Sequence, residues 1–174
     1  MRQLNRFVTS VAGVACTTVP AAVCVGVGIA AAAPPNQPEP NGAARVEFGT
    51  TERDCNFNPV PAISTTTATA RTGAGTGFAI IGTTLNQVIA EVHLTNAAPN
   101  ASYSVRLIEL PNLTCGPDAP GVATGTIETD PAGNGVVNLQ TVVVPGATGA
   151  WVVIFDRSVQ LYTSNTVAAL STGG

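Results

Sequence analysis

The residues best suited to chemistry in this sequence are Glu91, His93 and Arg106. Glu91 and His93 are two positions apart in a segment with strand character, so their side chains share one face. We expect the next strand to bring Arg106 beside them, joining a carboxylate, an imidazole and a guanidinium. Such a group can bind an anion or move a proton. The interpretation that we favour is an ordinary solvated sheet face, where opposite charges add roughly a few tenths of a kcal/mol.

Other catalytic or metal-binding sets are not found in the sequence. His93 is the only histidine, which excludes a multi-histidine copper or zinc site. No G-x-S-x-G elbow is present to carry a nucleophilic serine. The acidic pairs Glu52 with Asp54 and Glu128 with Asp130 flank expected turns, where acids commonly serve local hydrogen bonding. We therefore assign no catalytic residue, no metal ligand and no cofactor.

Two of the four cysteines are expected to form a disulfide. Cys16 and Cys24 lie in an apolar N-terminal stretch, which leaves Cys55 and Cys115 for the rest of the chain. Two cysteines in an exported domain most simply pair with each other. Both have loop-like neighbours, so the bridge would pin the start of the domain to the long loop after Leu110, unlike the sheet-to-sheet bridge of an antibody domain. Two free thiols are the alternative.

Residues 1–32 have the composition of a secretion signal. Two arginines precede residues 7–33, which carry no charge and end in a run of alanines. A basic start, an apolar middle and a small-residue end are typical of a signal peptide, which we expect to be cut after residue 32. The small residues around the cut are Ala30, Ala32 and Ala33. Retention as a membrane anchor and lipoprotein cleavage before Cys16 stay open, since about 20 apolar residues suffice to span a bilayer.

The next segment, residues 33–44 (APPNQPEPNGAA), predicts a flexible linker. A folded domain is expected over 45–170, followed by a disordered tail at 171–174. Without the signal, five arginines and ten acids give a formal charge of −5. An acidic surface with no basic cluster argues against nucleic acid or an anionic membrane as a partner. The chain has no lysine, and its richness in Ala, Gly, Val, Thr and Pro indicates a GC-rich genome, such as that of an actinobacterium.

Nearly every segment of the expected domain has strand character. Val, Thr and Ile are frequent, and Gly, Pro, Asn and Asp interrupt them at short intervals. Apolar and polar residues alternate in 88–94 and 103–107, which we expect to pair as a hairpin. A second hairpin is expected between 125–128 and 136–144. The remaining strands are expected at 45–48, 63–71, 77–81, 150–156 and 159–167.

This pattern predicts an all-β fold. No segment after the signal shows sustained helical periodicity, and about seven to nine strands with turns every ~8–12 residues are typical of an antiparallel β-sandwich, here immunoglobulin-like. The expected core side chains are Trp151, Phe155, Tyr103, Phe78 and Leu107.

The string EVHLTNAAPNASYSVRLIEL, followed by a cysteine, GTIETDPAGNGVVNL and AWVVIFD, resembles small exported β-sandwich proteins of actinobacterial, mycobacterial-like type. The resemblance covers roughly residues 50–160 and rests on the pattern of hairpin and turn segments. It implies an exported sandwich and brings no catalytic residues. The succession of strands and turns also resembles that of copper/zinc superoxide dismutase and of chordin-like repeat domains, but the metal-site histidines of the dismutase are absent.

The sequence thus predicts an exported, non-catalytic β-sandwich module that is secreted or associated with the cell envelope. Its role would be binding or structural, towards an unknown envelope or extracellular partner, with membrane contact only through an uncleaved signal. Two alternatives stay open. One is an enzyme of unrecognised type that uses loop carboxylates. The other is a secreted surface-interaction protein or antigen, which an exposed apolar patch would indicate. The loop carboxylates are Asp54, Asp118, Glu128 and Asp130.

Overall fold

The computed structural model describes residues 41–61 and 75–170, which form nine strands and no helix. The strands are β1 (Asn41–Gly49), β2 (Thr76–Thr84), β3 (Gln87–Thr95), β4 (Ser102–Leu110), β5 (Val122–Glu128), β6 (Gly135–Val142), β7 (Gly149–Asp156), β8 (Val159–Ser164) and β9 (Ala168–Ala169). Within this part of the chain no helix is present that could cross a membrane. The signal peptide with its cleavage residues, residues 33–40 of the linker, the strand expected at 63–71 and the tail lie outside the described residues.

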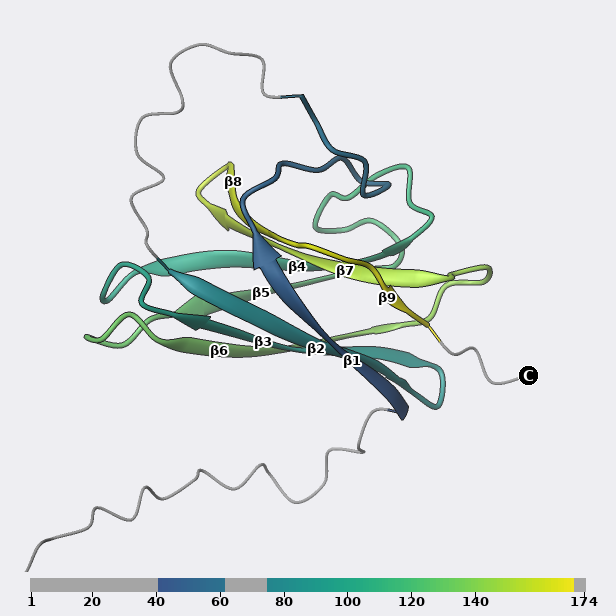
Figure 1. Cartoon of the computed structure of the whole chain (residues 1–174). Coiled ribbons are helices and arrows are strands. Elements are labelled where there is room, and N and C mark those ends of the chain that lie inside the picture. The colour runs from purple at the N-terminus through teal and green to yellow at the C-terminus, as the bar shows by residue number, and fades with distance from the viewer. Residues whose placement is uncertain (1–40, 62–74, 171–174) are drawn as a thin grey trace, which may run out of the picture. The chain divides into compact units, whose positions relative to one another are not determined.

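The strands form one antiparallel sheet that curls nearly into a barrel (Figure 1). Hydrogen-bonded neighbours follow the order β5-β4-β7-β8-β1-β2-β3-β6, and β9 pairs with β7. β1 joins the two halves of the sheet, because Glu47 pairs with Phe78 of β2 while Gly49 pairs with Thr163 of β8. The end strands β5 and β6 are not hydrogen-bonded to each other. The prediction of an all-β, antiparallel fold is confirmed.

The main core lies between the two halves of the curled sheet. Alternation in β3 buries every second side chain, and these four are at most 1% exposed: Val88, Ala90, Val92 and Leu94. Each Val or Leu taken out of water in this way stabilises the fold by roughly 1.5–3 kcal/mol. Of the expected core residues, Trp151, Tyr103 and Leu107 are buried, whereas Phe78 and Phe155 are only partly buried.

Both predicted hairpins are wrong. β3 pairs with β2 and β6, β4 pairs with β5 and β7, and β5 does not pair with β6. Alternation reports which face of a strand is buried, but it carries no information about the partner strand. The two connections instead cross between the halves of the sheet and bond to each other, since Ala97 N donates to Gly133 O (3.0 Å) and Asn100 N donates to Asp130 O (3.2 Å). Gly133 has φ +80°, and a Cβ there would collide with the carbonyl oxygen of Ala97, so glycine is required.

The tight hairpins occur where the sequence carries neither glycine nor proline. β2 and β3 are joined by Leu85 and Asn86, and β7 and β8 by Arg157 and Ser158. Leu85 and Arg157 have φ of 51° and 56°. Left-handed backbone is uncommon for such side chains, and neither hairpin was predicted, although the strands expected at 150–156 and 159–167 leave Arg157 and Ser158 between them. β1 begins at Asn41, inside the segment that we expected to be linker.

Candidate functional site

The outer side of β4 and β7, here called the covered face, lies beneath two loops, 50–61 and 111–121. Its three buried side chains form a small cluster separate from the main core: Ile108, Trp151 and Val153, each at most 1% exposed. The loops contribute Phe57 and Cys115 to this cluster. The rings of Phe57 and Trp151 meet edge to face, with centroids 5.5 Å apart. A second apolar core therefore exists outside the curled sheet, and it depends on the two loops staying in place.

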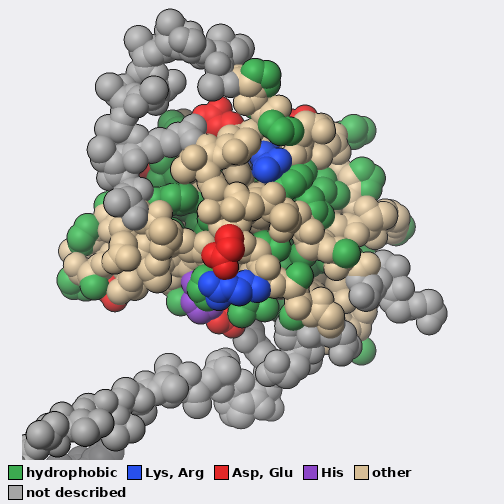
Figure 2. All heavy atoms as spheres, viewed as in Figure 1, with side chains coloured by type: hydrophobic (Ala, Val, Ile, Leu, Met, Phe, Trp, Pro, Cys, Tyr) green, Lys and Arg blue, Asp and Glu red, His purple; other side chains and the backbone are tan. Residues whose placement is uncertain are grey.

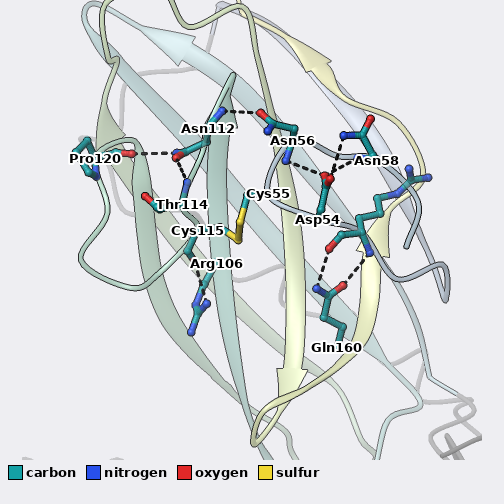
Figure 3. Close-up of a disulfide and its surroundings, with 11 residues drawn as sticks. Asp54, Cys55, Asn56, Asn58, Arg106, Asn112, Thr114, Cys115, Pro120 and Gln160 are labelled. Carbon is teal, nitrogen blue, oxygen red and sulfur yellow. Dashed lines mark hydrogen bonds between the residues drawn. A yellow bond between two sulfur atoms is a disulfide. The ribbon is translucent and has the colours of Figure 1, made fainter. Parts of the chain in front are cut away.

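The predicted disulfide between Cys55 and Cys115 is confirmed, and it joins these loops (Figure 3). The two Cα atoms are 5.3 Å apart, and 60 positions separate the cysteines along the chain. A hydrogen bond strengthens the junction, because Asn112 N donates to Asn56 Oδ1 at 3.1 Å. The bridge pins the start of the domain to the loop after β4, as expected. A disulfide is compatible with an oxidising compartment outside the cytosol.

Within loop 50–61, Asp54 holds the backbone in a tight turn. Its Oδ1 accepts hydrogen bonds from the backbone N–H groups of Asn56 (2.9 Å) and Asn58 (2.8 Å). Its Oδ2 accepts one from Asn58 Nδ2 (3.0 Å). These bonds hold the pKa of Asp54 below its ordinary value of 3.8, and the bond from the Asn58 side chain has the largest effect. The carboxylate is thus engaged in shaping its own loop.

Gln160 of β8 anchors the same loop to the sheet. Its Oε1 accepts a hydrogen bond from Arg53 N (3.1 Å), and its Nε2 donates one to Arg53 O (2.9 Å) (Figure 3). The guanidinium of Arg53 lies over the Phe57 ring, 3.8 Å from its centroid, and donates to Phe57 O (2.9 Å). The loop is therefore held from both sides.

Arg106 belongs to the covered face. Its Nη1 donates to Cys115 O at 2.9 Å, and its guanidinium lies 4.7 Å from the centroid of Phe155. The structure does not bring Arg106 beside Glu91 and His93, because β4 and β3 are not paired. The expectation of this three-residue cluster followed from the wrong hairpin and fails with it.

Glu91 and His93 lie on the outer side of β1, β2, β3 and β6, here called the open face. Glu91 Oε1 and His93 Nε2 are 2.5 Å apart, and their side chains are 46% and 25% exposed. His93 stacks on Phe78, with ring centroids 4.5 Å apart, and Arg45 lies over the Phe78 ring, 3.3 Å from its centroid. Arg45 also pairs with Glu47 at 2.7 Å. Figure 2 shows the chain's one histidine in purple beside basic and acidic side chains. The guanidinium over the ring that stacks on His93 thus comes from β1.

The acids of the β5–β6 connection also serve the local backbone. Asp130 Oδ1 accepts hydrogen bonds from the backbone N–H groups of Ala132 (2.8 Å) and Asn134 (2.9 Å). The Asn134 backbone is the main reason why the pKa of Asp130 lies below its ordinary value of 3.8. Glu128, the last residue of β5, instead accepts a hydrogen bond from the side-chain hydroxyl of Ser102 at 2.7 Å.

The four loop carboxylates are not gathered in one place. Asp54 and Asp118 lie on the disulfide-joined loops, whereas Glu128 ends β5 at its other end and Asp130 follows it. A strand of this length spans about 20 Å at ~3.3 Å per residue. Glycosidases hold their two acids less than about 10 Å apart. Residues 41–61 and 75–170 also contain no group of three or more His, Cys, Asp or Glu side chains that could hold a metal ion.

Sequence reasoning missed Glu109, a carboxyl inside the main core. The residue is 0% exposed, and its Oε2 accepts a hydrogen bond from Val144 N at 2.8 Å. Its Oε1 is buried with no hydrogen-bond partner in the described part of the chain. Burial raises the pKa of Glu109 above its ordinary value of 4.5. The signal was available, because the alternation of Tyr103, Val105 and Leu107 places residue 109 on the same inward face.

The surface of the joined loops combines rigidity with apolar exposure. Leu113 is 90% exposed and Val60 is 42% exposed. Asn112 Nδ2 donates to Pro120 O at 3.0 Å and its Oδ1 accepts from Thr114 N at 3.1 Å, so the backbone on both sides of Leu113 is fixed (Figure 3). An apolar side chain that a fixed backbone holds in water is suited to contact with another molecule.

No protein-family model matches the chain, and a search of curated proteins finds no match. The function of the joined loops and of the open face must therefore be argued from their geometry.

Proposed function

We propose that this chain is an exported, non-catalytic module, an immunoglobulin-like β-sandwich in fold, that binds a partner at the cell envelope or in the medium. The observation that supports this most is the pair of loops joined by Cys55 and Cys115. Their polar groups bond to one another, while Leu113 stays 90% exposed at their surface.

A binding role is supported because loops that are already ordered lose little conformational entropy when a partner binds. Loops that become ordered only on binding lose about 0.5–1.5 kcal/mol for each immobilised side chain. Here the disulfide, the Asn112–Asn56 bond and the turn around Asp54 have already fixed the loops. Binding surfaces are commonly loops held on a rigid scaffold. An apolar residue such as Leu113 would then fill a pocket of the partner.

Export is supported by the signal-like residues 1–32 and by a disulfide suited to an oxidising compartment. Mass spectrometry of the protein recovered from its source organism tests this part. We expect an N-terminus at Ala33. An intact Met1, or a lipid-bearing Cys16, would contradict cleavage at this place.

Binding is tested by co-sedimentation of the purified mature protein with isolated envelopes of the source organism. Leu113→Asn is expected to weaken binding by about tenfold, because loss of a central apolar contact costs about 1–2 kcal/mol. Leu85→Asn is the matched control, since Leu85 is 95% exposed but lies in the β2–β3 hairpin, away from the joined loops. Equal binding by wild type and Leu113→Asn would contradict the proposed surface. Hydrolytic or redox turnover that one point mutation abolishes would contradict the non-catalytic role.

A further inference from the structure

The open face carries a stack of three planar groups across β1, β2 and β3. Phe78 of β2 lies between the other two, because the His93 ring stacks on it with centroids 4.5 Å apart and planes 15° apart, while the Arg45 guanidinium lies 3.3 Å from its centroid. β1 and β3 flank β2, so the two groups cover opposite sides of the ring. Side chains held in this way lose little conformational freedom when another molecule binds them.

The charged groups of this stack are only half used within the chain. Arg45 donates through Nε to Glu47, and its two terminal nitrogens make no hydrogen bond to a described residue. Glu91 contacts His93 through Oε1, and its Oε2 has no partner among the same residues. The Arg45 and Glu91 side chains are 53% and 46% exposed. A free guanidinium fork and a free carboxylate oxygen can form strong, charge-assisted hydrogen bonds with another molecule.

The register of the strands places these charges in two neighbouring rows across the sheet. Each row has a half-buried apolar residue on β2 at its centre, with a basic side chain at one end and an acid at the other. The rows are Arg45, Ile80 and Glu91, and Glu47, Phe78 and His93. The basic side chain is on β1 in the first row and on β3 in the second, so the charge pattern alternates in both directions.

This pattern is complementary to itself about an axis along β2. When a second copy faces the first across a twofold axis parallel to that strand, each row meets the same row in reverse. Arg45 then faces Glu91 of the other copy, Glu47 faces its His93, and the two apolar residues of β2 face their own counterparts. A twofold interface requires such self-complementarity. The axis also keeps the strands of the two sheets nearly aligned, as in the usual packing of sheets face to face about 10 Å apart.

The size of the face indicates how tightly two copies would hold. Three strands spaced ~4.8 Å apart and the nine residues of β2 at ~3.3 Å each give about 400 Å² of sheet on each copy. Interfaces below about 1,200 Å² in total are typical of weak and transient complexes. The contact should therefore form at high micromolar concentration.

We propose that the open face is a self-association surface, on which two copies of this chain pack sheet against sheet around Phe78 and Ile80, with Arg45 of each copy bound to Glu91 of the other. The inference goes beyond the proposed function and does not depend on any partner of the joined loops. Those loops lie on the opposite side of the molecule's curled sheet, over β4 and β7, and stay available in the dimer.

The first test is sedimentation velocity on the purified mature protein from ~10 to ~500 μM, the range in which a weak interface is seen. We expect the mass to rise from one copy towards two as the concentration increases. NMR signals of Phe78 and His93 should shift over the same range, while those of Leu113 stay unchanged. A single copy at every concentration, or shifts confined to Leu113 and its loop, would overturn the proposal.

Two charge reversals test the register. Arg45→Glu places two acids opposite each other at each contact, and Glu91→Arg places two arginines there. Like charges held together at an interface are strongly unfavourable, so each variant alone should associate at least tenfold more weakly than wild type. An equimolar mixture of the two variants is expected to dimerise nearly as wild type does, because each contact in the mixed dimer again joins an arginine to a glutamate.

Arg157→Glu is the matched control, since it reverses the same charge at an exposed arginine in the β7–β8 hairpin, and it should dimerise as wild type does. Unchanged Trp151 fluorescence verifies that each variant is folded. Undiminished association of the two single variants, or failure of their mixture to recover the dimer, would overturn the pairing of Arg45 with Glu91 and with it the proposed surface.

Discussion

The covered face and the open face belong to the same curled sheet, yet their outward side chains differ in kind. On the covered face Ile108, Trp151 and Val153 are apolar and buried beneath the loops. On the open face the outward positions include Arg45 and His93, which pack against a half-buried phenylalanine, Phe78. The sheet itself does not decide which side is buried. The outward side chains are buried where a loop covers the sheet, and the sequence of each strand matches the presence or absence of such a loop.

β7 and β3 show this adaptation directly. β7 (GAWVVIFD) is buried at six consecutive positions, which is typical of a strand covered on both sides. β3 (QVIAEVHLT) alternates strictly between buried and half-buried, which is typical of a strand with one side in water. The two faces should therefore respond differently to the same kind of change.

The largest difference is expected on removal of the disulfide. Cys55→Ser with Cys115→Ser should lower the free energy of unfolding by about 4 kcal/mol, because an unbridged loop of this length gains chain entropy when the protein unfolds. Urea denaturation measures the loss. Trp151 emission in the remaining folded protein should shift to the red, because the loops no longer seal the covered face. A loss below about 1 kcal/mol would mean that hydrogen bonds alone hold the loops.

The next contrast removes one aromatic ring from each face. Trp151→Ala should cost about 3 kcal/mol, the lower part of the range for buried aromatics, because a cluster this near the surface can relax or admit water. Phe78→Ala, its counterpart on the open face, should cost about 1 kcal/mol, since the ring contributes a cation–π contact and partial burial. Thermal unfolding of both variants measures the difference. Equal losses would refute the idea that only one face carries a second core.

A smaller effect is expected where the covering loop meets the sheet. Gln160→Ala removes both hydrogen bonds to the backbone of Arg53 and should cost about 1–2 kcal/mol. Gln87→Ala is the matched control, because Gln87 on β3 makes no side-chain hydrogen bond to a described residue, and its loss should stay within about 0.5 kcal/mol. Chemical denaturation compares the two. Equal small losses would show that the disulfide alone positions loop 50–61.

The sequence predicted which side chains are buried and which cysteines pair, but not which strands are neighbours. Alternation in 88–94 predicted the buried face of β3, and compartment reasoning predicted the bridge between Cys55 and Cys115. The partner of each strand could not be predicted, because the cross-connections are fixed by contacts such as Ala97 with Gly133, which are distant in sequence. For this reason Arg106 was expected beside His93, where the structure places the Phe78 ring, with Arg45 over that ring.

The smallest predicted effect concerns pH and separates the interior from the open face. Burial raises the pKa of Glu109 in the folded protein above its ordinary value of 4.5. Its stabilising contribution is therefore complete below about pH 4.5 and is lost as the pH rises through the folded-state pKa, because the folded protein must then ionise a buried carboxyl. Glu109→Gln keeps an oxygen for Val144 N but cannot ionise. We expect this variant to flatten the fall in unfolding free energy above pH 4.5.

His93→Ala is the comparison for Glu109→Gln, because it disrupts the exposed pair with Glu91 and should change stability by only a few tenths of a kcal/mol, or about 0.5 at most. Urea denaturation of wild type and both variants between pH 4 and pH 8 decides the matter. If Glu109→Gln keeps the wild-type pH dependence, the fall in unfolding free energy above pH 4.5 does not come from Glu109. Water would then reach the Glu109 carboxyl, and its ionisation would cost the folded protein little free energy. The contact between Glu109 and Val144 would have to open more readily than its hydrogen bond indicates.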